Sequence, residues 1–174
     1  MHFSDYNSCI DYLFSLERVG IKYDLKNIES LCKHLGNPQL KFKSIHIAGT
    51  NGKGTVASVL NSIFMEGGYK CGLYTSPHII DFRERILING KQIDKQYIID
   101  FTNSVIKLIE KLVPSFFEVT TALAFKYFAE KKVDFAFIEA GLGGRLDSTN
   151  IIKPEISIIT SISIDHTEYL GDTI

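Results

Sequence analysis

The sequence predicts an α/β three-layer sandwich, in which a mostly parallel β-sheet carries helices on both faces. Short apolar runs typical of buried strands alternate with longer segments whose apolar residues recur at helical spacing. A glycine-rich loop joins the first such run to a helical segment. Parallel strands need crossover connections, so this alternation indicates a parallel sheet with functional loops at the carboxyl ends of its strands.

Residues 1–40 are predicted to form a helical N-terminal arm that precedes a core of residues 41–174. The arm contains two segments with an apolar helical stripe, residues 7–16 and 27–35. Ser4 or Asp5 can cap the first of them. The sequence therefore predicts two short helices ahead of the sheet.

The core is predicted to contain four buried strands, a hairpin and three helices. The strands are residues 45–48, 71–75, 135–140 and 155–161. The helices are residues 55–66, an amphipathic helix that follows Asp94 and carries Ile98 to Leu112, and residues 118–131. Asn89-Gly90 predicts a hairpin between residues 85–88 and 91–93, because this pair supplies the positive φ angles of a tight turn.

The composition argues against several functional classes. The 174 residues carry a net charge of −1, with 45% hydrophobic and 22% charged residues, which gives no electrostatic reason to expect nucleic acid or an anionic membrane as partner. No run approaches the roughly 18–20 apolar residues of a membrane span, and the N-terminus does not resemble a signal peptide. Three widely spaced cysteines indicate neither a disulfide framework nor a zinc site. A reducing, cytoplasmic location is expected.

A candidate phosphate loop lies between the first predicted core strand and its helix, with the residues Gly49, Thr50, Asn51, Gly52, Lys53, Gly54 and Thr55. Glycines let backbone N–H groups turn toward a phosphate, and Lys53 can reach the β- and γ-phosphates of ATP. Ile47 and Gly54 depart from the G-x-x-x-x-G-K-[ST] pattern. A glycine-rich turn without a ligand is the alternative. Lys53 in register favours a P-loop NTPase-like core that holds ATP with Mg²⁺.

Candidate magnesium ligands follow three of the predicted strands. Glu139 lies at the end of one strand, Ser76 follows another, and His166 follows a third. Mg²⁺ prefers hard oxygen ligands and keeps several waters. A serine before proline is more often a turn former, and a lone histidine more often structural. The residues alone leave the metal site open.

A candidate pocket for a flat heterocycle involves the start of the last predicted helix. Phe116 and Phe117 offer ring surface beside the carboxylate of Glu118, which can accept hydrogen bonds from N–H donors. Residues 76–85 could cover such a ligand, and residues 146–148 could form another wall. Burial of the two phenylalanines in the core is the alternative, and the residues alone favour it.

Five segments, in order, resemble the folylpolyglutamate synthase family of the Mur ligase superfamily, which includes bifunctional dihydrofolate synthases. They are AGTNGKGT at 48–55, LYTSPH at 73–78, FRER at 82–85, EAGLGGRLDSTN at 139–150 and SIDHT at 163–167. Together they span nearly the whole chain. An unrelated P-loop ATPase with a convergent loop is therefore a remote alternative.

The resemblance implies a ligase that joins L-glutamate to the carboxylate of folate or dihydropteroate through an acyl phosphate, with ATP and Mg²⁺. It implies nucleotide binding by residues 49–55, and metal ligation by Ser76, Glu139 and His166. Lys53, Glu139 and His166 would lie at the reacting centre. Pterin contacts are implied for Asp24, Leu25, Lys26, Asn27, Ser115, Phe116, Phe117, Glu118, Leu146, Asp147 and Ser148.

Two features of the family have no counterpart before Ile174. The family has a carbamylated lysine ligand downstream of the Asp-His segment, and a second domain for adenine and glutamate. We therefore expect the 174-residue chain to lack the glutamate-ligase domain and to be inactive alone. A non-catalytic fragment that binds ATP and pterin is the alternative. A monomer is expected at full length, and the residues do not distinguish dihydropteroate from tetrahydrofolate as acceptor.

Overall fold

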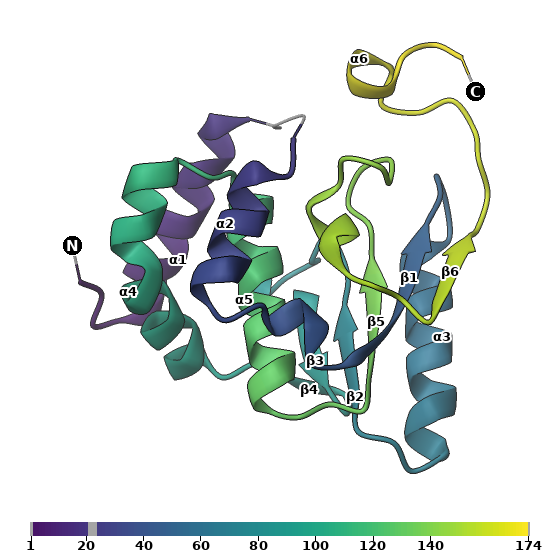
Figure 1. Cartoon of the computed structure of the whole chain (residues 1–174), viewed down its shortest axis with the longest axis horizontal. Coiled ribbons are helices and arrows are strands. Elements are labelled where there is room, and N and C mark those ends of the chain that lie inside the picture. Colours follow the sequence, from purple (N-terminus) through teal and green to yellow (C-terminus); the bar gives the residue numbers. More distant parts are fainter. Residues whose placement is uncertain (1, 21–23, 174) are drawn as a thin grey trace.

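The computed structural model describes residues 2–20 and 24–173, which form one six-stranded sheet with helices on both faces (Figure 1). The strands are β1 (Lys43–Ala48), β2 (Cys71–Tyr74), β3 (Ile86–Ile88), β4 (Lys91–Gln92), β5 (Phe135–Glu139) and β6 (Ile156–Ile159). Their order is β4-β3-β2-β5-β1-β6. Strands β2, β5, β1 and β6 run parallel, and β3 and β4 extend the sheet in antiparallel fashion. The predicted fold class is confirmed.

Helices cover both faces of this sheet. The α-helices among the described residues are α1 (Tyr6–Ser15), α2 (Lys26–His34), α3 (Lys53–Glu66), α4 (Lys95–Leu112), α5 (Phe116–Glu130) and α6 (Thr167–Leu170). Helix α3 packs alone on one face against β1, β2 and β5, whereas α5 lies on the other face with α1, α2 and α4 around it (Figure 1). The predicted helices that correspond to α1, α2, α3 and α5 begin and end within two residues of these bounds.

Alternate side chains of the central strands divide the core into two hydrophobic clusters. Ile47 of β1 and Phe137 of β5 point toward α3. Tyr74 of β2 and Ile138 of β5 point the other way, toward α5. Successive side chains of an extended strand point to opposite faces of the sheet. Because both faces are buried under helices, the strands are apolar at nearly every position.

The two N-terminal helices pack into the cluster on the α5 side. Leu13 of α1 and Leu31 of α2 are fully buried there. Asp5 caps α1, because its Oδ1 accepts a hydrogen bond of 3.0 Å from the backbone N–H of Ser8. The predicted arm thus contributes to the core.

The connections place the predicted loops at one edge of the sheet. The hairpin between β3 and β4 turns at Asn89 and Gly90, whose φ angles are 45° and 73°, as predicted. The loops that follow β1, β2, β5 and β6 all begin at the carboxyl ends of parallel strands and meet above the sheet (Figure 1).

After β6 the chain crosses above the sheet as a tail of residues 161–173, which carries the single turn of α6 (Figure 1). Every residue of this tail is exposed. The three cysteines, in contrast, are free and buried. None of the helices in the described parts of the chain is long and apolar enough to cross a membrane.

Candidate active site

The predicted phosphate loop connects β1 to the first turn of α3, and a pocket of about 350 Å³ opens beside it. The pocket is lined by the loop and by the ends of β2 and β5: Thr50, Asn51, Gly52, Lys53, Gly54, Thr55, Ser58, Thr75, Ser76, Pro77 and Glu139. Most of these residues are polar. Together with the positive end of the α3 dipole, such a lining suits an anion.

The tail after β6 fixes the shape of this loop. The Thr50 N–H donates to the Ser161 carbonyl at 2.6 Å. The Thr50 hydroxyl donates to the Ser163 carbonyl at 3.1 Å and accepts from the Ser163 N–H at 3.0 Å. The Thr160 hydroxyl donates to the Asn51 carbonyl at 2.7 Å. The sequence analysis missed Thr160 and Ser161, because their contacts with the loop depend on the pairing of β6 with β1.

Two loop residues, Gly49 and Lys53, owe their positions to this tight packing. Gly49 has a φ of +131°, and a Cβ there would lie 2.2 Å from Thr160 Oγ1, so only glycine fits without rearrangement. The Lys53 ammonium donates to the carbonyls of Gly49 and Thr50 at 2.8 and 3.2 Å. The cation is therefore held against the loop and beside the pocket.

Glu139 lies opposite the start of α3 and is only 5% exposed. Its Oε2 accepts a hydrogen bond of 3.0 Å from the Ser76 N–H. Burial raises the pKa of Glu139, while the N–H groups of Ser76 and Gly54 and the charge of Lys53 oppose this shift. A Cβ at Gly54 would lie 3.2 Å from Oε2. Gly54 thus gives the carboxylate room, which explains the glycine at this departure from the usual motif.

A larger groove of about 920 Å³ begins at Lys53, Ser76 and Pro77, which it shares with the phosphate pocket, and extends over the start of α5. The other lining residues are Glu17, Gly20, Arg85, Ser115, Phe116, Phe117, Glu118, Gly141, Leu142, Gly143, Gly144, Arg145, Leu146, Asp147, Ser148, His166, Tyr169 and Leu170. Seven predicted acceptor residues, those at 115–118 and 146–148, are among them.

The remaining predicted acceptor residues, Asp24, Leu25, Lys26 and Asn27, are not part of this lining. Asp24 accepts a hydrogen bond from the Lys26 N–H at the start of α2, and Leu25 packs against the core. The groove instead includes Glu17 and Gly20, which precede this segment.

Glu118 presents an unsatisfied oxygen in the groove wall. Its Oε2 accepts hydrogen bonds from the N–H and hydroxyl of Ser115, at 2.7 and 2.9 Å, which completes a capping box at the start of α5. Its Oε1 is buried and has no hydrogen-bond partner among the described residues. A buried carboxylate oxygen without a donor is costly, so the site is suited to a ligand that brings an N–H group.

A buried chain of hydrogen bonds fixes the loop after β5 beneath the groove. Asp147 Oδ2 accepts from the Leu142 N–H at 2.8 Å, and Oδ1 accepts from the hydroxyl of Thr149 at 2.5 Å. Because that hydroxyl donates to Asp147, it must accept from His46 Nε2, which lies 2.8 Å away. Burial lowers the pKa of His46, against the charge of Asp147, so a neutral imidazole with its proton on Nε2 fits the chain.

The proposed metal ligands are only partly gathered. Glu139 and Ser76 lie together at the phosphate pocket, whereas His166 lies in the exposed tail, 3.9 Å from Asp165. Within residues 2–20 and 24–173, no group of three or more His, Cys, Asp or Glu side chains could hold a metal. Mg²⁺ needs fewer, because one or two carboxylates suffice when phosphate oxygens and waters complete its shell. The hard oxygens of Glu139 and Ser76 fit this requirement.

Comparison with known proteins connects this geometry to a family. The model of the Mur ligase middle domain matches residues 47–173. The chain belongs to the Mur ligase family. Within it, the chain is 41% identical to the dihydrofolate synthase/folylpolyglutamate synthase of Bacillus subtilis, over 99% of this chain and 42% of that protein. The predicted resemblance is confirmed.

Solved structures of this Mur ligase branch share the fold. An FPGS–AMPPCP–folate complex superimposes with a TM-score of 0.91 at 38% identity, over 97% of this chain and 43% of that one. Escherichia coli FolC in complex with DHPP and ADP gives a TM-score of 0.84 at 33% identity, over 95% and 41% of the two chains. The chain thus spans about two fifths of the length of these three relatives.

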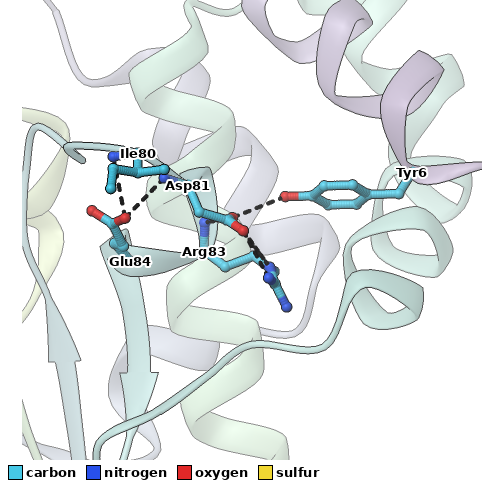
Figure 2. A network of polar contacts seen from close by, with 5 residues as sticks. All are labelled: Tyr6, Ile80, Asp81, Arg83 and Glu84. Carbon is cyan, nitrogen blue, oxygen red and sulfur yellow. Dashed lines mark hydrogen bonds and ion pairs between the residues drawn. The ribbon is translucent and has the colours of Figure 1, made fainter.

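A polar network holds the loop between β2 and β3, which forms one wall of the site in this Mur ligase chain (Figure 2). The Glu84 carboxylate accepts hydrogen bonds from the N–H groups of Ile80 and Asp81, at 3.2 and 2.8 Å. Asp81 pairs with Arg83 at 2.7 Å and accepts from the Tyr6 hydroxyl at 3.4 Å. Because Tyr6 belongs to α1, the network ties this wall to the N-terminal helices.

Asp81→Asn is expected to lower the free energy of unfolding at neutral pH by about 1 kcal/mol. Hydrogen bonds from Arg83 lower the pKa of Asp81 from 3.8 to about 2. The ionised carboxylate therefore stabilises the fold above its unfolded pKa, and this contribution is lost as the pH falls toward about 2. The shift alone corresponds to about 2.5 kcal/mol, but the side chain is 29% exposed and solvent screens the pair.

Urea unfolding of the wild type and Asp81→Asn at pH 7, 4 and 2.5 measures this effect. The difference between them should shrink across that series. Asp11→Asn, at an exposed position of α1, is the matched control and should follow the wild type. A difference that stays constant with pH would contradict the role of the Asp81 charge.

Proposed function

We propose that this chain binds ATP at the phosphate loop and a folate or dihydropteroate in the adjoining groove, for ligation of L-glutamate to the acceptor carboxylate. One observation carries the proposal: the phosphate pocket and the groove share Lys53, Ser76 and Pro77. A nucleotide and an acceptor bound there would meet at these residues. The relatives support the ligand classes, because one is a complex with AMPPCP and folate, and another with DHPP and ADP.

In the proposed reaction, an acceptor carboxylate oxygen attacks the γ-phosphorus of ATP, the bond to the β–γ bridging oxygen breaks, and ADP leaves. The amine of glutamate then attacks the acyl phosphate, loses a proton and displaces phosphate. Phosphoryl transfer requires positioning and neutralisation of charge more than covalent assistance. Lys53 and the N–H groups of Asn51, Gly52, Lys53 and Thr55 would hold the phosphates at the start of α3.

Bound Mg²⁺ would neutralise phosphate charge, with the Glu139 carboxylate and the Ser76 hydroxyl as its protein ligands. His166 is a further proposed ligand from the exposed tail. In the groove, the Phe117 ring offers a stacking surface and Glu118 Oε1 offers a free acceptor for a pterin N–H. The proposed acceptor wall is completed by Ser115, Phe116, Leu146, Asp147 and Ser148. Residues 24–27 are also proposed to contact the pterin, although they do not line the groove.

A second candidate function is binding of ATP and pterin without ligation by this chain. The described residues supply a phosphate pocket and an acceptor groove, and we assign none of them to the glutamate substrate. Incubation of the 174-residue chain with ATP, Mg²⁺, glutamate and either dihydropteroate or tetrahydrofolate distinguishes the candidates. Multiple-turnover conjugate, detected by mass, supports the ligase; binding of both ligands without conjugate supports the second candidate; absence of binding contradicts both.

Glu139→Gln is expected to remove most of the magnesium-dependent gain in ATP affinity, about tenfold or more. The amide oxygen can still accept from the Ser76 N–H, so the fold should persist, while the ligand charge is lost. Calorimetric titration of ATP with and without Mg²⁺ measures the gain. Glu66→Gln, exposed at the end of the same α3 helix, should retain it. An undiminished magnesium effect in folded Glu139→Gln would exclude Glu139 as a ligand.

A further inference from the structure

Arg85 is a buried cation to which the reaction above assigns no role. Its side chain is 7% exposed and lines the groove. Nε donates to His78 Nδ1 at 2.8 Å, and the guanidinium carbon lies 5.2 Å from the centre of the Phe116 ring. Among the described residues, its two terminal nitrogens have no hydrogen-bond partner, and no carboxylate forms an ion pair with it.

A guanidinium in this condition is unusual, because burial of a charge without a hydrogen-bonded anion is costly, and the carboxylates of Glu17 and Glu139 act on Arg85 only from beyond ion-pair distance. Burial lowers the pKa of Arg85, but arginine remains protonated in proteins. The cation–π contact with Phe116 uses the ring face and none of the N–H donors of the guanidinium. The side chain is therefore prepared for an anion that enters the groove.

Arg85 lies where the two proposed ligands would meet. On one side its charge acts on Glu139, which lines the phosphate pocket. On the other side it packs on Phe116, next to the proposed stacking surface of Phe117. A pterin against Phe117 whose carboxylate extends toward Lys53 would bring that carboxylate to Arg85.

We propose that Arg85 binds the acceptor carboxylate that receives the phosphoryl group, an inference that rests on the proposed function. The terminal N–H groups of a guanidinium match a carboxylate with two parallel hydrogen bonds. This pairing would offset the repulsion between the carboxylate and the triphosphate. It would hold one carboxylate oxygen for attack on the γ-phosphorus. As that O–P bond forms, the bond to the β–γ bridging oxygen breaks and ADP leaves with its electron pair.

Titration of the full chain with pteroate and with pteroate methyl ester tests this assignment, because the ester lacks the carboxylate charge. Arg85→Gln should weaken pteroate binding about tenfold or more and change ester binding less than about twofold. Arg85→Lys keeps the charge without the planar fork, and should fall between Arg85→Gln and the wild type. Arg18→Gln, exposed and outside the groove, controls for loss of one positive charge.

Three outcomes would overturn the assignment. Equal weakening of both ligands would show that Arg85 acts only through its packing on Phe116, and unchanged pteroate binding would show that it does not meet the carboxylate. If Arg85→Gln does not fold, the test uses the Arg85→Lys variant and the preference of the wild type for pteroate over the ester. Equal affinities of the wild type for pteroate and the ester would contradict the assignment of Arg85 to the carboxylate. A wild-type chain that binds neither pteroate nor its methyl ester, whether or not it binds ATP, contradicts the proposed acceptor site itself.

Discussion

Lys53→Ala is expected to weaken ATP binding about a hundredfold while leaving the fold intact. The Lys53 ammonium is held by the carbonyls of Gly49 and Thr50, beside the pocket that we assign to the phosphates. Its removal takes away a charge-assisted hydrogen bond to the terminal phosphates, and a hundredfold corresponds to about 2.7 kcal/mol. Alanine is a good helix former at the first residue of α3, so the structural cost is small.

Calorimetric titration with Mg-ATP measures this loss, and circular dichroism checks the fold. Lys107→Ala removes an exposed lysine from α4 and should bind ATP as the wild type does. Affinity within about threefold of the wild type in folded Lys53→Ala would remove Lys53 from the phosphate site.

Gly49→Ala is expected to destabilise the protein by about 3–5 kcal/mol and to disrupt the phosphate loop. The φ of +131° disfavours any side chain, and the new Cβ would lie 2.2 Å from Thr160 Oγ1 and 3.0 Å from the Ser161 carbonyl. Backbone strain and overpacking each contribute about 1–3 kcal/mol. The fold can accommodate the methyl group only by separating the loop from the tail after β6.

Gly52→Ala is the matched control for this substitution. Gly52 also has a positive φ, of +81°, but a Cβ there meets no atom within 4 Å. Its cost should be about 1 kcal/mol, from the backbone alone. Addition of Thr160→Ala to Gly49→Ala should recover part of the loss, because it removes the nearest contact. Urea unfolding measures the stability of the wild type, Gly49→Ala, Gly52→Ala and the Gly49→Ala/Thr160→Ala double variant. Equal losses of stability in Gly49→Ala and Gly52→Ala would rule out the steric explanation.

Much of the site could be predicted because parallel strands end at a common edge. That rule alone predicts that Ser76 and Glu139 lie beside the phosphate loop, although they follow Lys53 by 23 and 86 residues in the sequence. The sequence also contains the signal for the true start of α5. Ser115 and Glu118 form a capping box, which places the helix start at Phe116 rather than at residue 118.

What could not be predicted depends on strand order and on burial. The contacts of Thr160 and Ser161 with the phosphate loop exist because β6 is the neighbour of β1, and no local pattern specifies that pairing. Arg85 is buried against expectation for its residue type. Its environment comes from His78 and Phe116, one from the preceding loop and one from a helix start 31 residues later in the sequence.

The tail of residues 161–173 is exposed throughout, yet it takes part in both proposed ligand sites. Ser161 and Ser163 brace the phosphate loop, while Tyr169 and Leu170 form part of the groove lining. A segment with so little buried surface can open locally at a free energy far below that of global unfolding. Opening would dismantle both sites together. If both proposed ligands bind, we expect the first to lower the ordering cost for the second, so that binding of nucleotide and acceptor is positively cooperative through a shared conformational equilibrium.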